Sequence, residues 1–161
     1  MRELVLDKHN IDSEVIVSNV DEDEIKQSLL AEGANPLTIS KNLAEIKSIK
    51  VSNKKPNRLV LGADSVISLN EELINKPNSR EEALKILKKL NNSKHYLISS
   101  VCISKNGSMI WNYTDKAILT MKNMNEEYLK NYLSKISDEA LFAYNVYQIE
   151  GEGRSLFLKI E

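Results

Sequence analysis

The sequence is poor in the residues that build covalent cross-links and zinc sites. It holds one cysteine, Cys102, which cannot form a disulfide within the chain. The two histidines, His9 and His95, lie far apart, and no His/Cys cluster has the spacing of zinc ligands. We therefore expect neither a disulfide framework nor a zinc site.

Long apolar runs and an excess of charge are lacking as well. No run approaches the roughly 18 residues needed to span a bilayer, and the N-terminus, with Glu3 close to its start, lacks the apolar stretch of a secretory signal. The net charge of -1 gives no general attraction to polyanions, and the few clustered basic side chains are typical of a solvated helix end and loop. That cluster comprises Lys47, Lys50, Lys54, Lys55 and Arg58. We expect a cytoplasmic protein with no membrane or nucleic-acid partner.

What is present fits a globular protein. The chain has 161 residues, of which 42% are hydrophobic, enough for a core of its own, so we expect a single domain over residues 1–161. Helical and strand patterns alternate and include a hairpin, which predicts an α/β or α+β fold in which helices flank a mixed β-sheet.

Local patterns predict the elements of the first half. The alternating segment 14–18 predicts a strand, residues 23–31 predict a helix stopped by Gly33, and Pro36 opens a helix towards Val51. The apolar run 58–62 predicts a buried strand that ends just before Asp64, and residues 66–69 predict a second short strand.

The second half gives stronger signals. Ser79 with Glu82 forms a capping box at the start of an amphipathic helix, and Asn125 caps another helix. Asn106-Gly107 joins two long strands at a hairpin turn. The expected strands are 95–104, 108–121, 147–149 and 156–158, the last two separated by a glycine turn.

Asp64 is the first candidate for chemistry. An acid just beyond a buried strand lies where open α/β sheets form ligand crevices, and Gly62 would let backbone approach a ligand closely. The alternative is a turn aspartate that satisfies nearby backbone amides. The residues alone leave both interpretations open.

Two further candidates have equally plain alternatives. Lys76, followed by Pro77, could contact phosphate from a stiffened loop, or simply face solvent. Glu22 lies in an acidic helix start, where the helix dipole alone favours a carboxylate. If Glu22 met Asp64 in space, the two carboxylates could hold Mg²⁺ or Mn²⁺, and Lys47 and Lys76 would neutralise phosphate charge.

Two other residues are assigned to structure. Tyr96-Leu97-Ile98 follow His95 on an expected strand, which favours a structural histidine over a catalytic base. Cys102 lies in an expected core strand and is interpreted as a small hydrophobe.

Taken together, the ordered segments resemble the Maf family of nucleotide pyrophosphatases over essentially the whole chain. The segments are Val20-Asp21-Glu22, Leu43 through Lys47, Leu59 through Val66, Asn75-Lys76-Pro77, Glu82-Ala83 and Leu90 through His95. Any one of them alone is weak, whereas the series in this order and spacing is specific.

The resemblance implies hydrolysis of a nucleoside triphosphate between the α and β phosphates with a divalent metal, Mg²⁺ or Mn²⁺. It assigns Asp64 as general base, Glu22 as a metal or water ligand together with Asp64, and Lys47 and Lys76 as phosphate contacts. These roles agree with the chemistry of phosphoryl transfer, in which metal and lysines offset charge while a carboxylate activates water. It also suggests a homodimer.

Base choice in such enzymes is tied to the residue after the GAD segment and to a Gln or Glu near the C-terminal glycine. Here these are Ser65 and Glu150. A carboxylate would accept hydrogen bonds from the N1-H and amino group of guanine, which favours a 7-methyl-GTP-type substrate modestly over dTTP or UTP. Gln148 could reach the same pocket in place of Glu150.

The chain also departs from the family pattern. The usual opening strand and Ser-x-Ser-Pro-Arg-Arg phosphate loop are represented only by Arg2, and the Gly-Leu-Pro segment and last helix are not seen after Glu161. The resemblance implies a fragment lacking roughly ten residues in front and about 30 behind, so we expect an exposed sheet edge or core face. A nucleotide-binding or division-regulating protein without catalysis is the alternative function, and a purely structural fragment the third.

Overall fold

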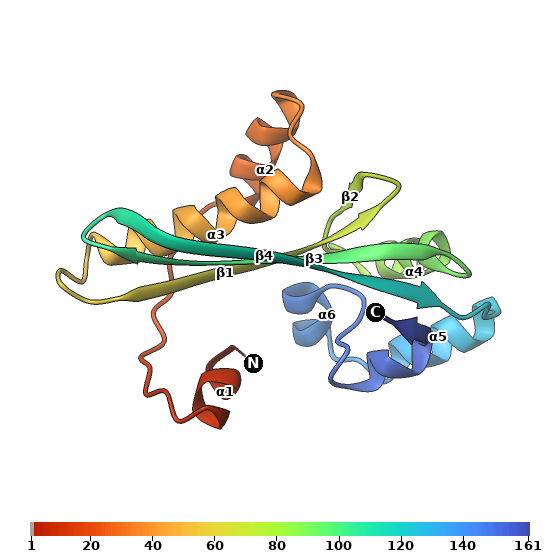
Figure 1. Cartoon of the computed structure of the whole chain (residues 1–161). Helices are drawn as coiled ribbons and strands as arrows, with labels where there is room; N and C mark the ends of the chain where they lie inside the picture. Colours follow the sequence, from red (N-terminus) through yellow and green to blue (C-terminus); the bar gives the residue numbers. More distant parts are fainter. Residues whose placement is uncertain (1) are drawn as a thin grey trace.

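The computed structural model describes residues 2–161, with side chains described from Val5 onward. Helices pack on both faces of one five-stranded sheet (Figure 1), whose strand order is β2-β1-β3-β4-β5. The expected α/β fold with a sheet flanked by helices is confirmed. Within the described residues, the four strand pairings are all antiparallel.

The elements alternate along the chain. The helices are α1 (Arg2–Lys8), α2 (Glu22–Ala31), α3 (Pro36–Ser52), α4 (Arg80–Leu90), α5 (Glu126–Ser134), α6 (Asp138–Tyr144) and the short 3-10 helix η1 (Glu152–Leu156). The strands are β1 (Val60–Leu69), β2 (Glu72–Ile74), β3 (Lys94–Lys105), β4 (Ser108–Met121) and β5 (Phe157–Ile160). None of the helices in the described part of the chain has the length and apolar character needed to cross a bilayer.

The capping residues begin the helices where the sequence predicts. The Asn35 side chain accepts a hydrogen bond from the Thr38 amide at 2.8 Å, directly before Pro36. Ser79 accepts from the Glu82 amide at 3.1 Å, and Asn125 accepts from the Tyr128 amide at 2.8 Å. Each cap satisfies an amide that the helix itself leaves without a partner, so these starts are fixed locally.

The core lies in two layers, one on each face of the sheet. Helix α3 covers one face and contributes Ile39 and Leu43, which pack with Val66 and Ile98 of the strands. Helices α4, α5 and α6 cover part of the opposite face (Figure 1) and form the larger cluster with Ile67 of β1. Side chains alternate along a strand, so consecutive residues of β1 enter different layers.

The expected strand at residues 14–18 is wrong. Residues 11–20 are irregular, and Val15 and Val17 are 65% and 73% exposed. The segment is instead tied by side chains, because Lys50 donates a hydrogen bond to the Asn19 carbonyl and Lys55 lies 3.5 Å from Glu14. Alternating hydrophobicity marks a segment that suits a strand, but a strand also needs a ladder partner.

The expected end of the first buried strand is also wrong. Residues 60–69 form one strand, β1, that pairs with β3 throughout Val60 to Ser68, so Asp64 lies within the strand and opposite Ser100. Gly62 and Asp64 are poor strand formers, but the ladder with β3 overrides their local preference. The two predicted strands are therefore one.

A third correction concerns the C-terminal region. Residues 147–149 form no strand, whereas β5 confirms the one expected around 156–158. The apolar residues Val146 and Tyr147 are buried, but within a turn that side-chain hydrogen bonds hold in place. A short apolar segment without alternation is found both in strands and in buried turns, so the sequence pattern does not distinguish the two.

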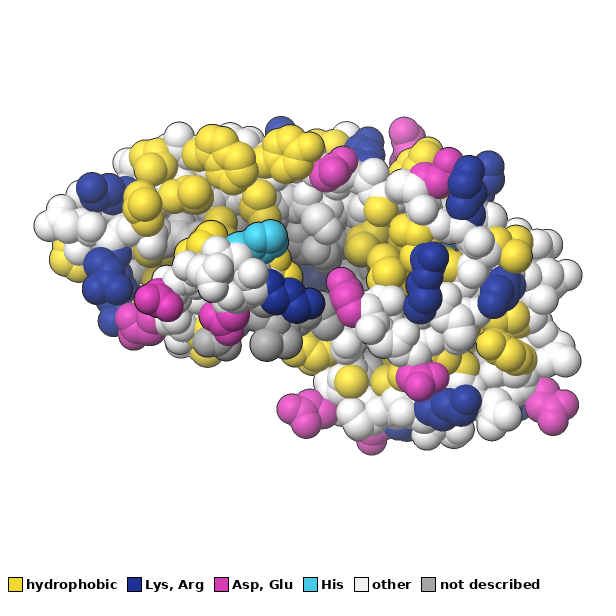
Figure 2. Space-filling model, turned by 60° about the horizontal axis from the view of Figure 1, so that its bottom comes forward, with side chains coloured by type: hydrophobic (Ala, Val, Ile, Leu, Met, Phe, Trp, Pro, Cys, Tyr) yellow, Lys and Arg dark blue, Asp and Glu magenta, His cyan; other side chains and the backbone are white. Residues whose placement is uncertain are grey.

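On the face opposite α3, helices α4, α5 and α6 leave one half of the sheet without their cover (Figure 1). Within the described residues, β1 pairs with β3 alone between Val60 and Val66, which leaves its outer edge open. Figure 2 shows hydrophobic side chains gathered over the half of the lower sheet face away from α5. Leu61 and the stacked rings of Trp111 and Tyr113, 6.4 Å apart, are among the exposed apolar side chains. The outer edge of β1 and the adjoining half of this face are therefore exposed within the described residues.

Candidate active site

Strand β1 directs Asp64 towards α3. Gly62, Asp64 and Val66 share the face that α3 covers, and Asp64 is only 5% exposed. The hydroxyl of Ser40 on α3 donates to the Asp64 backbone carbonyl at 3.2 Å, which ties strand and helix together at this point. A buried carboxylate needs compensating partners.

The close approach of α3 to β1 depends on Gly62. A Cβ at this position would lie 2.3 Å from the Ala44 carbonyl oxygen and 2.9 Å from the Ser48 amide nitrogen, both backbone atoms. The facing side of α3 is lined by the small residues Ser40, Ala44 and Ser48, all buried. Helix and strand therefore lie near enough for a lysine one turn along α3 to reach the strand.

Lys47 is that lysine, and it lies between two carboxylates. Its Nζ is 2.7 Å from Oδ1 of Asp64 and 2.7 Å from Oε1 of Glu22. The Lys47 side chain is 14% exposed, so water screens these contacts weakly. The three charges form one chain, carboxylate to ammonium to carboxylate.

Glu22 enters this chain from the first turn of α2. Asp21 caps the helix by accepting from the Glu24 amide at 3.0 Å, and Lys26 lies 3.9 Å from Glu22 on the next turn. Burial acts to raise the pKa of Glu22, but the hydrogen bond from Lys47 and the charges of Lys47, Lys76 and Lys26 outweigh it and hold the pKa below its ordinary value. Glu22 is therefore ionised at neutral pH.

Lys76 completes the predicted group at longer range. It is exposed on the loop between β2 and α4, next to the buried Pro77. Its charge contributes to the lowered pKa of Glu22, so Lys76 lies within electrostatic reach of that carboxylate. Of the four residues expected to act together, Lys47 contacts both Glu22 and Asp64 directly. Lys76 interacts with Glu22 through its charge.

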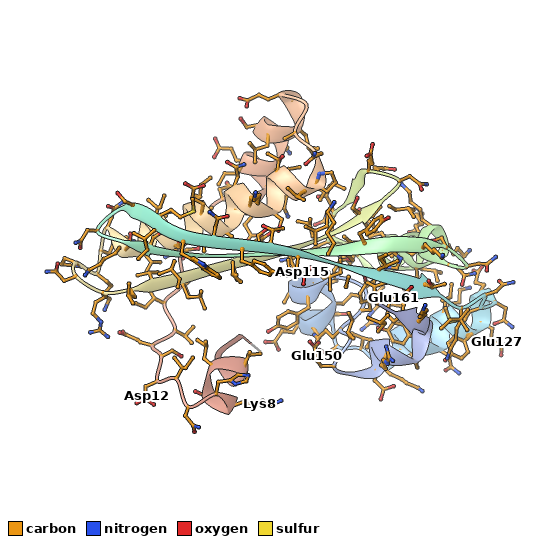
Figure 3. All side chains as sticks on the ribbon, in the orientation of Figure 1. Lys8, Asp12, Asp115, Glu127, Glu150 and Glu161 are labelled. Atoms are coloured by element: carbon orange, nitrogen blue, oxygen red, sulfur yellow. The ribbon has the colours of Figure 1, made fainter. Side chains whose placement is uncertain are left out.

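The other predicted residues lie elsewhere. Ser65 points away from α3, with its hydroxyl 2.9 Å from that of Ser99. Arg2 lies in α1, and its side chain falls outside the described residues. Gln148 is half-buried and lines a cavity of about 280 Å³ between α5, α6 and the turn at 145–153, whereas Glu150 is exposed and lies below the sheet in Figure 3.

This arrangement divides the predicted site between two faces of the sheet. Asp64 faces α3, while the cavity with Gln148 lies on the side of α5 and α6. The outer edge of β1, which is open between Val60 and Val66 within the described residues, offers a nucleotide one route between the two faces.

The structural assignments of His95 and Cys102 are confirmed. His95 is fully buried, and its Nε2 lies 2.8 Å from the Tyr147 hydroxyl. Burial lowers the pKa of His95 to about 4, which keeps the ring neutral at physiological pH. Cys102 is 1% exposed and lies 3.0 Å from the Ser48 hydroxyl.

Sequence reasoning missed the buried hydroxyl groups beneath α3. Ser40 lies 3.0 Å from Ser100, and Ser100 lies 2.9 Å from Thr114, which links α3 to β3 and β4. The signal for them was the repeat of small residues at four-residue spacing, Ser40, Ala44 and Ser48, which marks a helix face that packs closely. Lys26 was missed as well, although it follows Glu22 by one helical turn.

The donor set fits a divalent metal that is shared with a substrate. Within the described part of the chain, no group of three or more His, Cys, Asp and Glu side chains gathers in a way that would hold a metal unaided. Glu22 and Asp64 nevertheless converge on one cationic centre, the Lys47 ammonium. Mg²⁺ is commonly held by one or two carboxylates plus substrate phosphates and water, which matches this pair.

Comparison with known proteins identifies the family. The model of the Maf-like protein family matches residues 1–161. The chain belongs to the Maf-like family. A nucleoside triphosphate pyrophosphatase from Pelagibacter ubique is 63% identical over 161 residues, covering 100% of this chain and 83% of the relative. The same name is carried by a relative from Paramagnetospirillum magneticum, 36% identical over 99% of this chain and 82% of its own length.

A third relative carries a narrower name. A 7-methyl-GTP pyrophosphatase from Brucella abortus is 32% identical over 160 residues, covering 99% of this chain and 80% of the relative. Relatives of this chain are thus named both for nucleoside triphosphates in general and for 7-methyl-GTP in particular.

Proposed function

We propose that this Maf-like chain is a hydrolase that cleaves a nucleoside triphosphate between the α and β phosphates, giving a nucleoside monophosphate and pyrophosphate. The observation that carries the proposal is Lys47 held between Glu22 and Asp64 at 2.7 Å from each, in a chain similar to nucleoside triphosphate pyrophosphatases. Two carboxylates and a lysine within one contact chain supply the charges that phosphoryl transfer requires.

Asp64 acts as the general base in this proposal. The Lys47 contact keeps it oriented, and the close packing of α3 on β1 restricts its rotamers. A carboxylate that is fixed in this way can orient a water molecule and accept its proton as the water attacks phosphorus. Lys47 and Lys76 bind phosphate oxygens and offset the charge that develops on them.

Glu22 and Asp64 would also hold the divalent metal, Mg²⁺ or Mn²⁺. Bound there, the metal would neutralise phosphate charge and polarise the bond to be cleaved. Glu22 is available as a charged ligand, because burial raises its pKa less than the Lys47 hydrogen bond and the neighbouring lysine charges together lower it.

The substrate preference is the finer part of the proposal. We place the triphosphate on the α3 side of β1 and the base on the side of Gln148 and Glu150, across the open strand edge. Glu150 would accept from a guanine edge, and its charge also suits the positive ring of 7-methylguanine. We expect kcat/KM for 7-methyl-GTP to exceed that for UTP or dTTP by about 3–10-fold, the range that one hydrogen-bonding group gives in a solvent-accessible site.

The experiment is product analysis with a panel of nucleotides. The purified chain is incubated with 7-methyl-GTP, GTP, UTP and dTTP, each with Mg²⁺, Mn²⁺ or EDTA, and products are separated by ion-exchange chromatography. Monophosphate and pyrophosphate in equal amounts, formed only with metal, are the expected result. Diphosphate with inorganic phosphate would contradict α–β cleavage, and binding without turnover would favour the non-catalytic alternative.

Glu150→Gln and Gln148→Ala separate the two candidate base-reading residues. If Glu150 reads the base, Glu150→Gln lowers the ratio of kcat/KM for 7-methyl-GTP to that for UTP, while Gln148→Ala leaves the ratio within about twofold of the parent. The reverse pattern assigns base reading to Gln148. The proposal also includes a homodimer, which sedimentation equilibrium tests. It further includes a cytoplasmic location, where nucleoside triphosphates are available.

A further inference from the structure

The turn between α6 and η1 is held in place without a strand ladder. After Tyr144 the chain runs through an irregular segment in which Val146 and Tyr147 are 0% and 6% exposed. Gln148 and Glu150 follow directly, and Gln148 faces the cavity of about 280 Å³. The two candidate base-reading residues therefore depend for their position on whatever fixes this turn.

Two buried phenol groups fix it. Tyr132 of α5 donates its hydroxyl proton to the Val146 carbonyl at 2.9 Å. The Tyr147 hydroxyl lies 2.8 Å from Nε2 of His95, which belongs to β3 in the centre of the sheet. The second contact attaches the turn to the central strand of the sheet, because β3 pairs with a strand on each side.

The His95 contact is a hydrogen bond between neutral groups. His95 is fully buried, and burial lowers its pKa to about 4, while burial raises the pKa of Tyr147 above its ordinary value. A neutral imidazole offers one donor and one acceptor, so the bond forms with either tautomer. Within the described residues, Nδ1 of His95 has no hydrogen-bond partner, so the Tyr147 hydroxyl is the contact that compensates burial of this ring.

Packing restricts the turn from the other side. The Tyr147 ring meets Phe157 edge to face, with centroids 4.9 Å apart. A Cβ at Gly153 would lie 2.5 Å from the Gln148 carbonyl oxygen and 2.8 Å from its amide nitrogen, so the turn closes directly onto Gln148. The backbone of Gln148 is thus confined between the Tyr147 anchor and Gly153.

We propose that Tyr147 and His95 are positioning residues for nucleotide recognition, which hold the Gln148–Glu150 turn where it meets the base. Neither residue touches the reacting phosphates, because Asp64 and Lys47 lie on the opposite side of the sheet. The inference rests on the proposed function and adds to it the assignment of substrate affinity to a buried His–Tyr hydrogen bond.

A positioning role makes a prediction that a merely structural role does not. Loss of the hydrogen bond releases the turn, so KM for the nucleotide rises, while kcat at saturation is unchanged because the Asp64 group is intact. A residue that only supports folding lowers stability without moving KM, since the molecules that remain folded bind normally.

The experiment uses two variants that remove the bond and one that keeps it. Tyr147→Phe retains the ring and removes the hydroxyl, His95→Leu removes the imidazole, and His95→Gln places an amide nitrogen near the position of Nε2. The control, Leu87→Val, removes one methylene from the same core cluster at a position on α4, outside the turn, and leaves the His95–Tyr147 hydrogen bond in place. For each variant, kcat and KM are measured for the preferred triphosphate, with calorimetric Kd for its non-hydrolysable α,β-methylene analogue and the melting temperature.

We expect Tyr147→Phe and His95→Leu to raise KM and the Kd of the analogue by about fivefold or more, with kcat within about twofold of the parent. His95→Gln should give values near those of the parent. Leu87→Val should lower only the melting temperature. A KM and Kd within twofold of the parent in both bond-deleting variants overturn the inference. If the parent binds the analogue without turning over the triphosphate, the proposed function fails while the Kd series still decides the inference. A parent that binds no nucleotide overturns both.

Discussion

The Lys47 ammonium donates to Asp64 at 2.7 Å across the interface between α3 and β1, and the same nitrogen contacts Glu22 at 2.7 Å. A lysine held between two acids cannot leave without placing two like charges in one site. The contact therefore affects both stability and catalysis, and substitutions of its residues should change these two properties to different extents.

Asp64→Asn should lower pyrophosphate release by about 10²–10⁴-fold, because the amide keeps the shape of the side chain and cannot accept a proton from water. Stability should fall by about 1–3 kcal/mol, since Lys47 loses one charged hydrogen-bond partner and keeps Glu22. Steady-state release assays and urea unfolding measure the two effects. Glu72→Gln, which removes an exposed carboxylate on β2, is the control, and equal activity of both variants would rule out Asp64 as the base.

Lys47→Met should change how stability depends on pH. In the parent, burial acts to raise the pKa of Glu22, but Lys47 and neighbouring lysines lower it overall, so Glu22 contributes stability that is complete above about pH 4.5 and is lost as pH falls through the folded pKa. Without the Lys47 charge, Glu22 and Asp64 repel each other while both are ionised, so the stability that the variant loses relative to the parent should be larger at pH 7 than at pH 5. Urea unfolding across pH 7 to 3 tests this, and parallel curves for parent and variant would contradict it.

Gly62→Ala should separate α3 from β1. The new Cβ would lie 2.3 Å from the Ala44 carbonyl oxygen, a backbone atom that cannot move without shifting the helix. We expect a stability loss of about 2–3 kcal/mol from overpacking and a fall in kcat of more than about tenfold, because Lys47 moves away from Asp64. Gly151→Ala, where the nearest atom would be 3.9 Å away, should unfold close to the parent, which provides the comparison for the stability measurement.

His95 should make the protein lose stability in mild acid. Burial lowers its pKa from 6.5 to about 4, so between these values the unfolded chain binds a proton that the folded chain does not. Unfolding free energy should therefore fall by about 1.4 kcal/mol per pH unit below pH 6.5 and level off near pH 4, about 3 kcal/mol in all.

His95→Gln removes this titration, so its stability curve should stay nearly flat over the same range. His9→Gln, at an exposed histidine, should retain the fall seen in the parent. Urea unfolding at intervals from pH 7.5 to 4 measures all three proteins, and a fall in His95→Gln as steep as in the parent would assign the acid sensitivity to other groups.

The elements that the sequence predicts correctly carry their own boundary signals. Asn35, Ser79 and Asn125 each bind an amide three residues on, and Asn106-Gly107 closes the β3–β4 hairpin, so these features need no distant partner. The strand expected at 14–18 fails for the opposite reason. Its alternation is local, but a ladder requires a second strand, and Val15 and Val17 face solvent instead.

The candidate site shows the same limit. Glu22, Lys47 and Asp64 could be named from the order of motifs, yet their contact depends on Gly62 admitting α3 against β1, which no local pattern states. The position of Asp64 within a strand, with Ser65 on the other face, follows from pairing with Ser100 and Ser99. The His95–Tyr147 bond joins residues 52 positions apart and was beyond local reasoning for the same reason.

The sole cysteine of the chain lies under the helix that carries Lys47. Cys102 is opposite Gly62 in the β1–β3 register, with its sulfur 3.0 Å from Ser48 of α3, and burial raises the pKa of its thiol. Cys102 is 1% exposed although it lines a cavity of about 250 Å³ beside α3, so a thiol reagent reaches the sulfur when α3 moves away from the strands, and the labelling rate reports that opening. A bound triphosphate that bridges Lys47 and the strand would slow the labelling of Cys102. The labelling rate would therefore report nucleotide binding even when no nucleotide is hydrolysed.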